Sequence, residues 1–364
     1  MKILHFFSSF SFGGQQARLA SIVGGMGARA SHEVVAFDGV FDAREGFADG
    51  IDIQYRHLPM VKTGGVSLKN LQRIKTLIGD AAPDLVCTYN WGTIEAVIAN
   101  QFGPKLPHIH FEDGFGPDET IEQQNRKRSL MRMAVLRGIP VIVPSRGLEA
   151  LAKERWRLPN AQVRLIENGV DVDKFAAPGR VPQANILIGS VGSLRPEKNY
   201  SRLIEAVQSL QRTHRVRLEI VGSGAEQKAL ENAAAQLGEE IVRLPGASAD
   251  TRGAYHRFDI FALSSNTEQA PISLMEAMSS GLPILSTDVG DIIDMVCDEN
   301  RPFITPLGDE DAYRAALEAL IKNPALRHHL GAENVKKAKA EFASDVMVGR
   351  YETLFDEVLK NSTR

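Results

Sequence analysis

The chain has 364 residues, of which 43% are hydrophobic and 24% are charged, and its formal net charge is −3. These proportions are typical of globular proteins, and they exclude a disordered, fibrous or membrane-embedded chain. The near balance of charges provides no overall basic field, so we expect no nucleic-acid partner. The length exceeds what one hydrophobic core usually organises, so two domains are expected.

The first residues predict a strand, a glycine turn and a helix instead of an export signal. Residues 3–7 form a short strand-like run, Gly13 and Gly14 follow, and apolar residues then recur at helical spacing. No apolar run approaches the roughly 18 residues that a membrane-spanning helix needs. The two cysteines, Cys87 and Cys297, show neither metal-ligand nor redox spacing, which fits a reducing compartment. We therefore expect a cytoplasmic protein.

Short β-branched runs alternate with helical patterns along the rest of the chain. Examples are HEVVAF and DLVCTY in the first half, and VRLEIVG and LPILST in the second. This alternation predicts an α/β fold class with two Rossmann-like, doubly wound parallel-sheet domains. A turn-rich stretch near 178–183 separates them, so we expect domains at 1–180 and 181–344. Because parallel sheets bind ligands at the carboxyl ends of their strands, the active site is expected in the interdomain cleft.

Two glutamates, Glu268 and Glu276, flank Pro271 in the stretch NTEQAPISLMEAMSSGLP. Proline breaks a helix interior, so the two carboxylates must belong to different elements. Pro271 suits a first turn and Gly281 suits the position after the last turn, which predicts a helix at about 271–280. Free amides at the start of such a helix bind phosphate, and here they belong to Ile272, Ser273 and Leu274. A sugar nucleotide, with hydroxyl groups on both sides of a diphosphate, matches this arrangement.

The same stretch resembles the E-x7-E donor motif of glycosyltransferase family 4. Further matches follow in the family's order: FGGQQARLA, VIVPSRGLEALAKERW, IENGVDVDKF, GSVGSLRPEKNYSRLIEA and LEIVGSGAEQKALENAAAQLG. Together they cover essentially the whole chain. The resemblance implies a retaining enzyme of the GT-B fold, with the acceptor bound by the N-terminal domain and the donor by the C-terminal one. It also implies that the final helix, at about 345–364, crosses back onto the N-terminal domain.

The resemblance assigns roles to the charged residues of the second half. It implies that Glu276 binds the ribose of the donor and that Glu268 approaches the hydroxyl groups of the donor sugar. Lys198, in SLRPEKN, is expected to neutralise the leaving diphosphate. The family usually pairs this lysine with an arginine at the position of Ser193, so Arg195 is the nearest substitute.

Two features of the first half complete the predicted site. Gly13 and Gly14 are expected to let the backbone approach the diphosphate. Family members often carry a histidine at the position that aligns with Asp113 in HIHFEDGFGPDE, and His110 is interpreted as a buried strand residue. Glu112 and Asp113 are both catalytic candidates, either to stabilise positive charge on the sugar or to accept the proton of the acceptor. The sequence leaves these roles open.

The stretch NRKRSLMRMAVLRG, from Asn125 to Gly138, places five basic residues beside an apolar set. Such a helix can lie on an anionic membrane surface, or it can present a solvated basic face above core packing. Both interpretations stay open. Because family members often glycosylate lipid-linked acceptors, the first one predicts peripheral contact with the inner face of the cell membrane.

These features predict a retaining glycosyltransferase of the hexosyltransferase type. It would transfer a sugar from a nucleotide diphosphate sugar to a glycan or lipid-linked saccharide acceptor in cell-surface polysaccharide biosynthesis. No metal or other cofactor is expected, because Lys198 and the helix amides can neutralise the diphosphate. The alternatives are a nucleotide-sugar epimerase of the same build, which needs no acceptor, a non-catalytic paralogue that senses nucleotide sugars, and an exported sugar-binding protein.

Overall fold

The computed structural model describes residues 1–11, 13–47, 50–61, 65–114, 119, 123–178, 185–238, 240–248 and 250–362. The chain forms two compact units, Met1–Asn168 with Asp345–Arg364, and Gly169–Ser344. Positions 180 and 181, between which the sequence places the domain boundary, lie outside the described residues.

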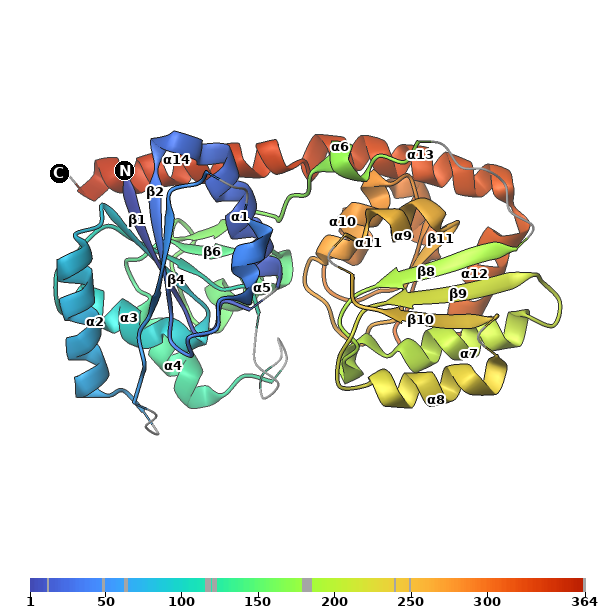
Figure 1. The fold of residues 1–364 in the computed structure, drawn as a ribbon, viewed down its shortest axis with the longest axis horizontal. Helices are drawn as coiled ribbons and strands as arrows, with labels where there is room; N and C mark the ends of the chain where they lie inside the picture. The colour runs from blue at the N-terminus through green and yellow to red at the C-terminus, as the bar shows by residue number, and fades with distance from the viewer. Residues whose placement is uncertain are drawn as a thin grey trace. The chain divides into compact units, whose positions relative to one another are not determined.

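The N-terminal unit is built on a parallel sheet with the order β3-β2-β1-β4-β5-β6-β7, seven strands in the part of the chain that the structure describes (Figure 1). Its strands are β1 (Lys2–Phe7), β2 (Ser31–Ala36), β3 (Ile53–His57), β4 (Leu85–Tyr89), β5 (His108–Phe111), β6 (Val141–Val143) and β7 (Val163–Leu165). Its helices are α1 (Gly14–Met26), α2 (Leu68–Ala81), α3 (Ile94–Gln101), α4 (Arg126–Val135), α5 (Arg146–Glu154) and most of α14 (Ser344–Ser362).

Helices cover both faces of this sheet. Helices α1 and α14 pack on one face, and α2 and α3 pack on the other. Apolar side chains of α14, among them Tyr351 and Phe355, are buried in the same cluster as Ile22 of α1. The two helices approach closely at Gly25, where a Cβ would lie 2.7 Å from a methyl carbon of Val348. The last helix of the chain is therefore part of the N-terminal unit's core.

The C-terminal unit repeats this plan with a sheet of order β10-β9-β8-β11-β12-β13. Its strands are β8 (Ile186–Val191), β9 (Val216–Val221), β10 (Val242–Gly246), β11 (Ile260–Leu263), β12 (Ile284–Thr287) and β13 (Ile304–Thr305). Its helices are α6 (Val172–Phe175), α7 (Tyr200–Leu210), α8 (Gln227–Leu237), α9 (Arg252–Arg257), α10 (Ile272–Ser279), α11 (Ile292–Met295), α12 (Glu310–Lys322) and α13 (Pro324–Glu341). Helices α7, α8 and α12 share one core cluster with the sheet.

Both sheets are doubly wound, because the chain starts in the middle of each sheet and builds outward in two directions. The strand order reverses between β1 and β4 in one unit and between β8 and β11 in the other. Among the described residues, the strand pairings of both sheets are all parallel. At such a reversal the loops that follow the two central strands turn in opposite directions, and the gap between them is the usual ligand site. In the described part of the chain, no helix is long and apolar enough to cross a membrane.

Candidate active site

Three of the predicted charged residues of the C-terminal unit, Arg195, Lys198 and Glu268, lie on the two loops at its strand reversal. The loop after β8 contains the short 3-10 helix η4 (Pro196–Lys198), and the loop after β11 carries Glu268 and leads into α10. These strands are neighbours in the sheet although they are far apart in sequence. The fold therefore brings Lys198 and Glu268 to the position where an open parallel sheet binds its ligand.

Hydrogen bonds fix the two loops to each other. The amide of Asn266 donates to the carbonyl oxygen of Glu197 at 2.7 Å, and the hydroxyl of Ser264 donates to the carbonyl oxygen of Lys198 at 3.0 Å. From α7, the guanidinium of Arg202 donates to the carbonyl oxygen of Ser264 at 2.7 Å. These bonds hold the backbone on both sides of the predicted site in one geometry.

Lys198 and Glu268 form an ion pair, with 2.5 Å between Nζ and Oε1. The hydroxyl of Ser265 donates to the same carboxylate oxygen at 2.6 Å. Only 19% of the Lys198 side chain and 9% of the Glu268 side chain are exposed, so the pair is largely shielded from water. Arg195 does not join it, since its side chain is 65% exposed and lies 3.8 Å from Glu197.

Helix α10 begins directly after Pro271, which serves as its N-cap in an extended conformation. The expectation of a free amide at Leu274 is wrong, because this amide closes the first turn by donating to the carbonyl oxygen of Pro271 at 3.1 Å. The amides of Ile272 and Ser273 have no hydrogen-bond partner among the described residues. The positive end of the helix therefore keeps two donors for a ligand.

One face of α10 is accessible and the rest of the helix is buried. Ile272, Ser273 and Glu276 are half-buried, whereas every other residue of the helix is fully buried. Residues three and four apart lie on the same face of a helix. The accessible face thus combines the two unpaired amides with the Glu276 carboxylate.

The Glu276 carboxylate is held by a buried tyrosine. The hydroxyl of Tyr255, in α9, donates to Oε2 of Glu276 at 2.6 Å. Burial raises the pKa of Glu276 to about 7, although the bond from Tyr255 and the charge of Lys174 oppose this shift. The ionised fraction of this carboxylate therefore changes near neutral pH.

Gly290 supports the loop that carries Glu268. Its φ is +61°, and a Cβ at this position would lie 2.5 Å from the carbonyl oxygen of Glu268 and 2.6 Å from that of Gln269. The amide of the next residue, Asp291, donates to the carbonyl oxygen of Gln269 at 3.0 Å. Only glycine fits both this backbone conformation and this close approach.

In the N-terminal unit, Gly13 and Gly14 lie where expected, between β1 and α1. Both are exposed, Gly13 is the extended N-cap residue, and Gly14 is the first residue of the helix. A Cβ on Gly13 would lie 2.9 Å from the side-chain oxygen of Gln16. The backbone of this turn is therefore accessible at the carboxyl end of β1, beside the strand reversal of its sheet.

Asp113 forms a buried ion pair. Arg18, from α1, contacts both of its carboxylate oxygens, with 2.8 Å between Nη2 and Oδ2. The Arg18 side chain is 2% exposed and that of Asp113 is 10% exposed. The amide of Asp113 donates to Oδ1 of Asn90 at 2.7 Å. This bidentate pairing occupies both oxygens and disfavours a role for Asp113 as a proton acceptor.

The structure disfavours the expected role of Glu112 on a substrate, because this side chain is completely buried. Its carboxylate accepts from Nε and Nη2 of Arg132 at 3.3 and 3.2 Å, and it lies 3.2 Å from Nε2 of His110. Burial alone would raise the pKa of Glu112, but the charge of Arg132 and the bond to His110 outweigh it and lower the pKa. Glu112 is thus a structural counter-ion, and His110 is buried as expected.

The basic stretch 125–138 contains α4, whose side chains do not separate cleanly into basic and apolar faces. Arg132 is buried, whereas Leu130 is 61% exposed. Arg128 pairs with Glu119 at 3.2 Å, and Lys127 and Arg126 are exposed. One of the five basic residues therefore belongs to the core, and one apolar residue faces outward with the remaining cations.

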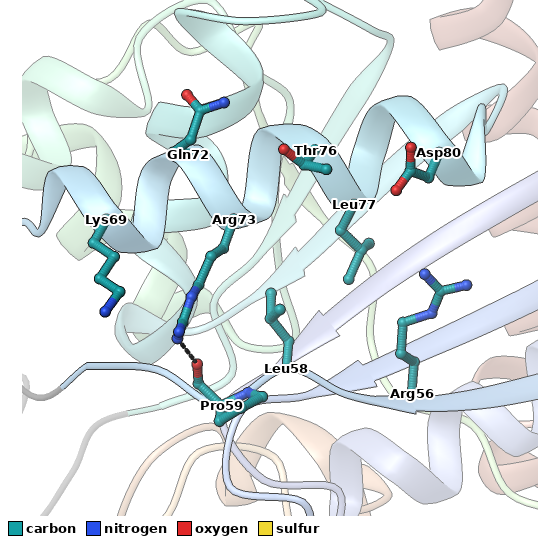
Figure 2. Close-up of a pocket in the computed structure, with 9 residues that line it drawn as sticks. All are labelled: Arg56, Leu58, Pro59, Lys69, Gln72, Arg73, Thr76, Leu77 and Asp80. Carbon is teal, nitrogen blue, oxygen red and sulfur yellow. Dashed lines mark hydrogen bonds between the residues drawn. The ribbon is translucent and has the colours of Figure 1, made fainter.

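A pocket of about 710 Å³ lies elsewhere in the N-terminal unit, between α2 and the edge strand β3 (Figure 2). Its wall includes Arg73, whose guanidinium donates to the carbonyl oxygen of Pro59 at 2.8 Å. None of the residues that the sequence analysis selected lines this pocket. Its position therefore adds no residue to the candidate site.

Two Asp-x-Asp pairs occur in the chain, and in each the first aspartate caps a helix. Asp171 accepts from the amide of Lys174, and Asp309 accepts from the amide of Ala312. Within the described ranges, no three His, Cys, Asp or Glu side chains come close enough together to hold a metal ion. A donor site without metal remains a prediction.

Comparison with known proteins decides the family. The family model described as "Glycosyl transferases group 1" matches residues 171–337, and the one described as "Glycosyltransferase Family 4" matches residues 12–174. Together the two models cover most of both units. The chain belongs to glycosyltransferase family 4. The resemblance that the motifs indicated is confirmed.

The curated relatives compared with this chain are distant. It is 27% identical over 202 residues to the GDP-mannose-dependent alpha-mannosyltransferase of Mycobacterium tuberculosis, a match that covers 51% of this chain and 50% of the relative. It is 23% identical over 207 residues to the capsular polysaccharide biosynthesis glycosyltransferase CapM of Staphylococcus aureus, with 54% of each chain covered. The chain thus spans about half the length of the curated relatives that it matches.

Solved structures share the fold over nearly the full length of the chain. HepE of Anabaena, solved in complex with UDP, superimposes with a TM-score of 0.82 at 19% identity, and the match covers 98% of this chain and 100% of HepE. Sucrose-phosphate synthase of Thermosynechococcus elongatus gives a TM-score of 0.79 at 19% identity, with 99% of both chains covered. The predicted GT-B fold of two Rossmann-like sheets is confirmed.

Proposed function

We propose that this family 4 glycosyltransferase binds a nucleotide diphosphate sugar in its C-terminal unit and transfers the sugar with retention of the anomeric configuration. The observation that carries the proposal is the accessible face of α10. It presents the unpaired amides of Ile272 and Ser273 together with Glu276. The Lys198–Glu268 ion pair connects the loop after β8 to the loop that leads into α10. A diphosphate bound there meets donors from a helix terminus and an ammonium group.

In this proposal each group has a separate task. The two amides and Lys198 stabilise the negative charge that develops on the diphosphate as its bond to the sugar breaks. Glu268 accepts hydrogen bonds from hydroxyl groups of the donor sugar, and Glu276 accepts them from the ribose. Lys198 already lies against Glu268, so a bound phosphate shares this ammonium group with the carboxylate. Gly13 and Gly14 would supply accessible backbone at the carboxyl end of β1.

The donor class is also supported by the relatives. Structures of HepE contain UDP and UDP-glucose, and the mycobacterial relative is named for GDP-mannose. These names differ in both base and sugar, so the proposal extends to the nucleotide diphosphate sugars as a class. The capsular and lipopolysaccharide core glycosyltransferases among the relatives support a glycan or lipid-linked saccharide as the acceptor, in cell-surface polysaccharide biosynthesis.

Peripheral contact with a membrane is the part of the proposal that rests on α4. Leu130 is 61% exposed, and Arg126 and Lys127 are exposed on the first turn of the same helix. Exposed apolar and cationic side chains on one helix attract an anionic lipid surface. A lipid-linked acceptor would lie at such a surface.

A thermal-shift screen with UDP-, GDP- and ADP-sugars tests the donor site. A ligand at about 100 times its dissociation constant stabilises a protein by roughly 2.7 kcal/mol. We expect one class of nucleotide sugar to raise the melting temperature of the wild type, and Glu276→Ala to abolish the shift. Glu205→Ala, which changes an exposed glutamate of α7, is the matched control and should keep the shift. If no nucleotide sugar shifts the wild type, the donor site is assigned wrongly.

Turnover assays then separate transfer from other fates of the donor. A transferase consumes the donor faster when an acceptor glycan is present, and NMR of the product reports the anomeric configuration. Isomerisation of the donor without an acceptor would indicate an epimerase. Binding with neither transfer nor slow donor hydrolysis would indicate a protein that only senses nucleotide sugars.

A further inference from the structure

We propose that Tyr255 is a positioning residue of the donor site, which holds the Glu276 carboxylate so that its second oxygen faces the ligand. This inference rests on the proposed function, because it takes Glu276 as a donor-binding residue. No sequence motif pointed to Tyr255, which lies 21 residues before Glu276 and in a different helix.

The Tyr255 hydroxyl has a fixed position because the ring is enclosed by other aromatic rings. Tyr255 is 0% exposed. Its ring centroid lies 5.6 Å from that of Phe175 in an edge-to-face arrangement, 5.7 Å from that of Phe261 and 6.0 Å from that of Phe258. Such a packed ring cannot rotate to a different site without displacing its neighbours. The packing of the ring therefore favours the orientation in which the hydroxyl points at Glu276.

The helices that carry the two residues are also tied together. The carbonyl oxygen of Phe175, at the end of α6, accepts from the hydroxyl of Ser280 at 2.9 Å and lies 3.1 Å from Nε2 of His256. Ser280 directly follows α10, and His256 is the neighbour of Tyr255 in α9. One carbonyl group thus connects both helices, which keeps the distance between the Tyr255 hydroxyl and Glu276 constant.

Glu276 needs this support because its side chain is long and only half-buried. A glutamate side chain has several rotamers, and ordering it costs conformational entropy. The bond from Tyr255 uses Oε2, and no described donor contacts Oε1. The bond selects one orientation before the ligand arrives and leaves Oε1 as the acceptor for a ligand hydroxyl.

The same bond also favours the ionised form of Glu276. Two described groups act on its charge, the Tyr255 hydroxyl from α9 and the Lys174 ammonium from α6. Both partly offset the effect of burial, and the resulting pKa is about 7. Tyr200 lies near enough to act on Tyr255 but not directly on Glu276. Removing the hydroxyl removes one of the two groups that favour the carboxylate, so the pKa of Glu276 rises further. Donor binding that needs the carboxylate should then require a higher pH.

The test compares Tyr255→Phe with Tyr313→Phe. Tyr313 is a fully buried tyrosine of the same unit, and its hydroxyl donates to the carbonyl oxygen of Leu263 at 3.1 Å, so the control also loses one buried hydroxyl bond. The affinity for whichever nucleotide sugar stabilises the wild type is measured by calorimetry from about pH 6 to about pH 9. We expect Tyr255→Phe to weaken binding about tenfold at neutral pH and by less at alkaline pH. Tyr313→Phe should leave the profile unchanged.

A second substitution keeps the test decisive if Tyr255→Phe fails to fold. Site-specific 3-fluorotyrosine at position 255 retains the ring and the hydroxyl but makes the hydroxyl a stronger donor. The pH profile of donor affinity should then move toward lower pH. An unchanged profile, or an equal loss of affinity at every pH, would show that Tyr255 is only a core residue.

The two proposals fail in different ways. If no nucleotide sugar binds the wild type, the proposed function fails. If a nucleotide sugar binds the wild type and the binding is lost in Glu276→Ala but retained in Tyr255→Phe across the pH range, only the positioning role fails.

Discussion

Both units carry acidic residues at the carboxyl ends of their parallel strands. The groups that neutralise these carboxylates differ between the two units. In the N-terminal unit, Asp113 and Glu112 are paired with Arg18 and Arg132, whose side chains are 2% and 1% exposed. In the C-terminal unit, Glu268 is paired with Lys198, which is 19% exposed.

Glu276 differs further, because its one side-chain hydrogen-bond partner among the described residues is a tyrosine hydroxyl. A buried guanidinium occupies a carboxylate with fixed, bidentate bonds, whereas an ammonium group or a hydroxyl leaves part of it available. The acids of the N-terminal unit therefore hold the fold together, whereas those of the C-terminal unit keep carboxylate oxygens available for a ligand.

The largest effect is expected from breaking the buried network of the N-terminal unit. Arg132→Met leaves the buried carboxylates of Glu112 and Glu119 without this cation. We expect a loss of about 3–5 kcal/mol in the free energy of unfolding, measured by urea denaturation. Arg126→Met, at an exposed position of the same helix, should change it by no more than about 0.5 kcal/mol.

The pH dependence of this loss has a definite sign. The pKa of Glu112 is lowered in the folded protein, so its pairing stabilises the fold above the ordinary glutamate pKa of about 4.3 and less as the pH falls below it. The difference in stability between the wild type and Arg132→Met should therefore shrink on acidification. A difference that stays constant would mean that Glu112 is not the group that needs Arg132.

The next effect concerns the ion pair of the C-terminal unit, where the comparison predicts a loss of activity instead of a loss of stability. Lys198→Ala removes the ammonium group proposed to face the diphosphate, and we expect kcat to fall roughly 10²–10³-fold. Arg195→Ala should lower it by no more than about fivefold, because this side chain is 65% exposed. Equal losses in the two variants would mean that Arg195 shares the diphosphate with Lys198.

A smaller effect is expected from the glycine that supports Glu268. Gly290→Ala combines a φ of +61° with a Cβ 2.5 Å from the carbonyl oxygen of Glu268. We expect it to cost about 1–3 kcal/mol of stability and to weaken donor binding, measured by calorimetry. Gly281→Ala is the matched control, since its φ is +69° but its nearest neighbour would be 3.6 Å away. It should cost less and leave donor binding intact.

The sequence alone was sufficient to predict the two parallel sheets and the separation of Glu268 and Glu276 into different elements. The strands are β-branched runs, and Pro271 separates the elements of Glu268 and Glu276 for a local, steric reason. Both kinds of signal are local along the chain. The structure confirmed the fold, with Glu268 on the loop after β11 and Glu276 in α10.

What the sequence could not reveal depends on contacts between distant positions. Arg18 lies 95 residues from Asp113, and Arg132 lies 20 residues from Glu112 on a helix that was expected to present its cations outward. After the strand ends at Phe111, the side chain of Glu112 points inward and lies beside His110. No local sequence pattern predicted this orientation. Tyr255 is another such case, because it meets Glu276 only through the packing of α9 and α10 on α6.

The smallest effect is expected from the exposed residues of α4. They differ from Arg132, which lies in the same helix but is buried. If the exposed residues of α4 contact a membrane, Lys127→Gln should weaken binding to vesicles of phosphatidylglycerol and phosphatidylethanolamine by about 1 kcal/mol, or roughly fivefold, in a sedimentation assay. Lys228→Gln, at an exposed position of α8 in the other unit, is the control. Equal losses would indicate a diffuse charge effect, and no binding by the wild type would remove the membrane from the proposal. Retained binding in Lys127→Gln but not in Leu130→Ser would mean that apolar insertion, and not the cation, holds α4 at the surface.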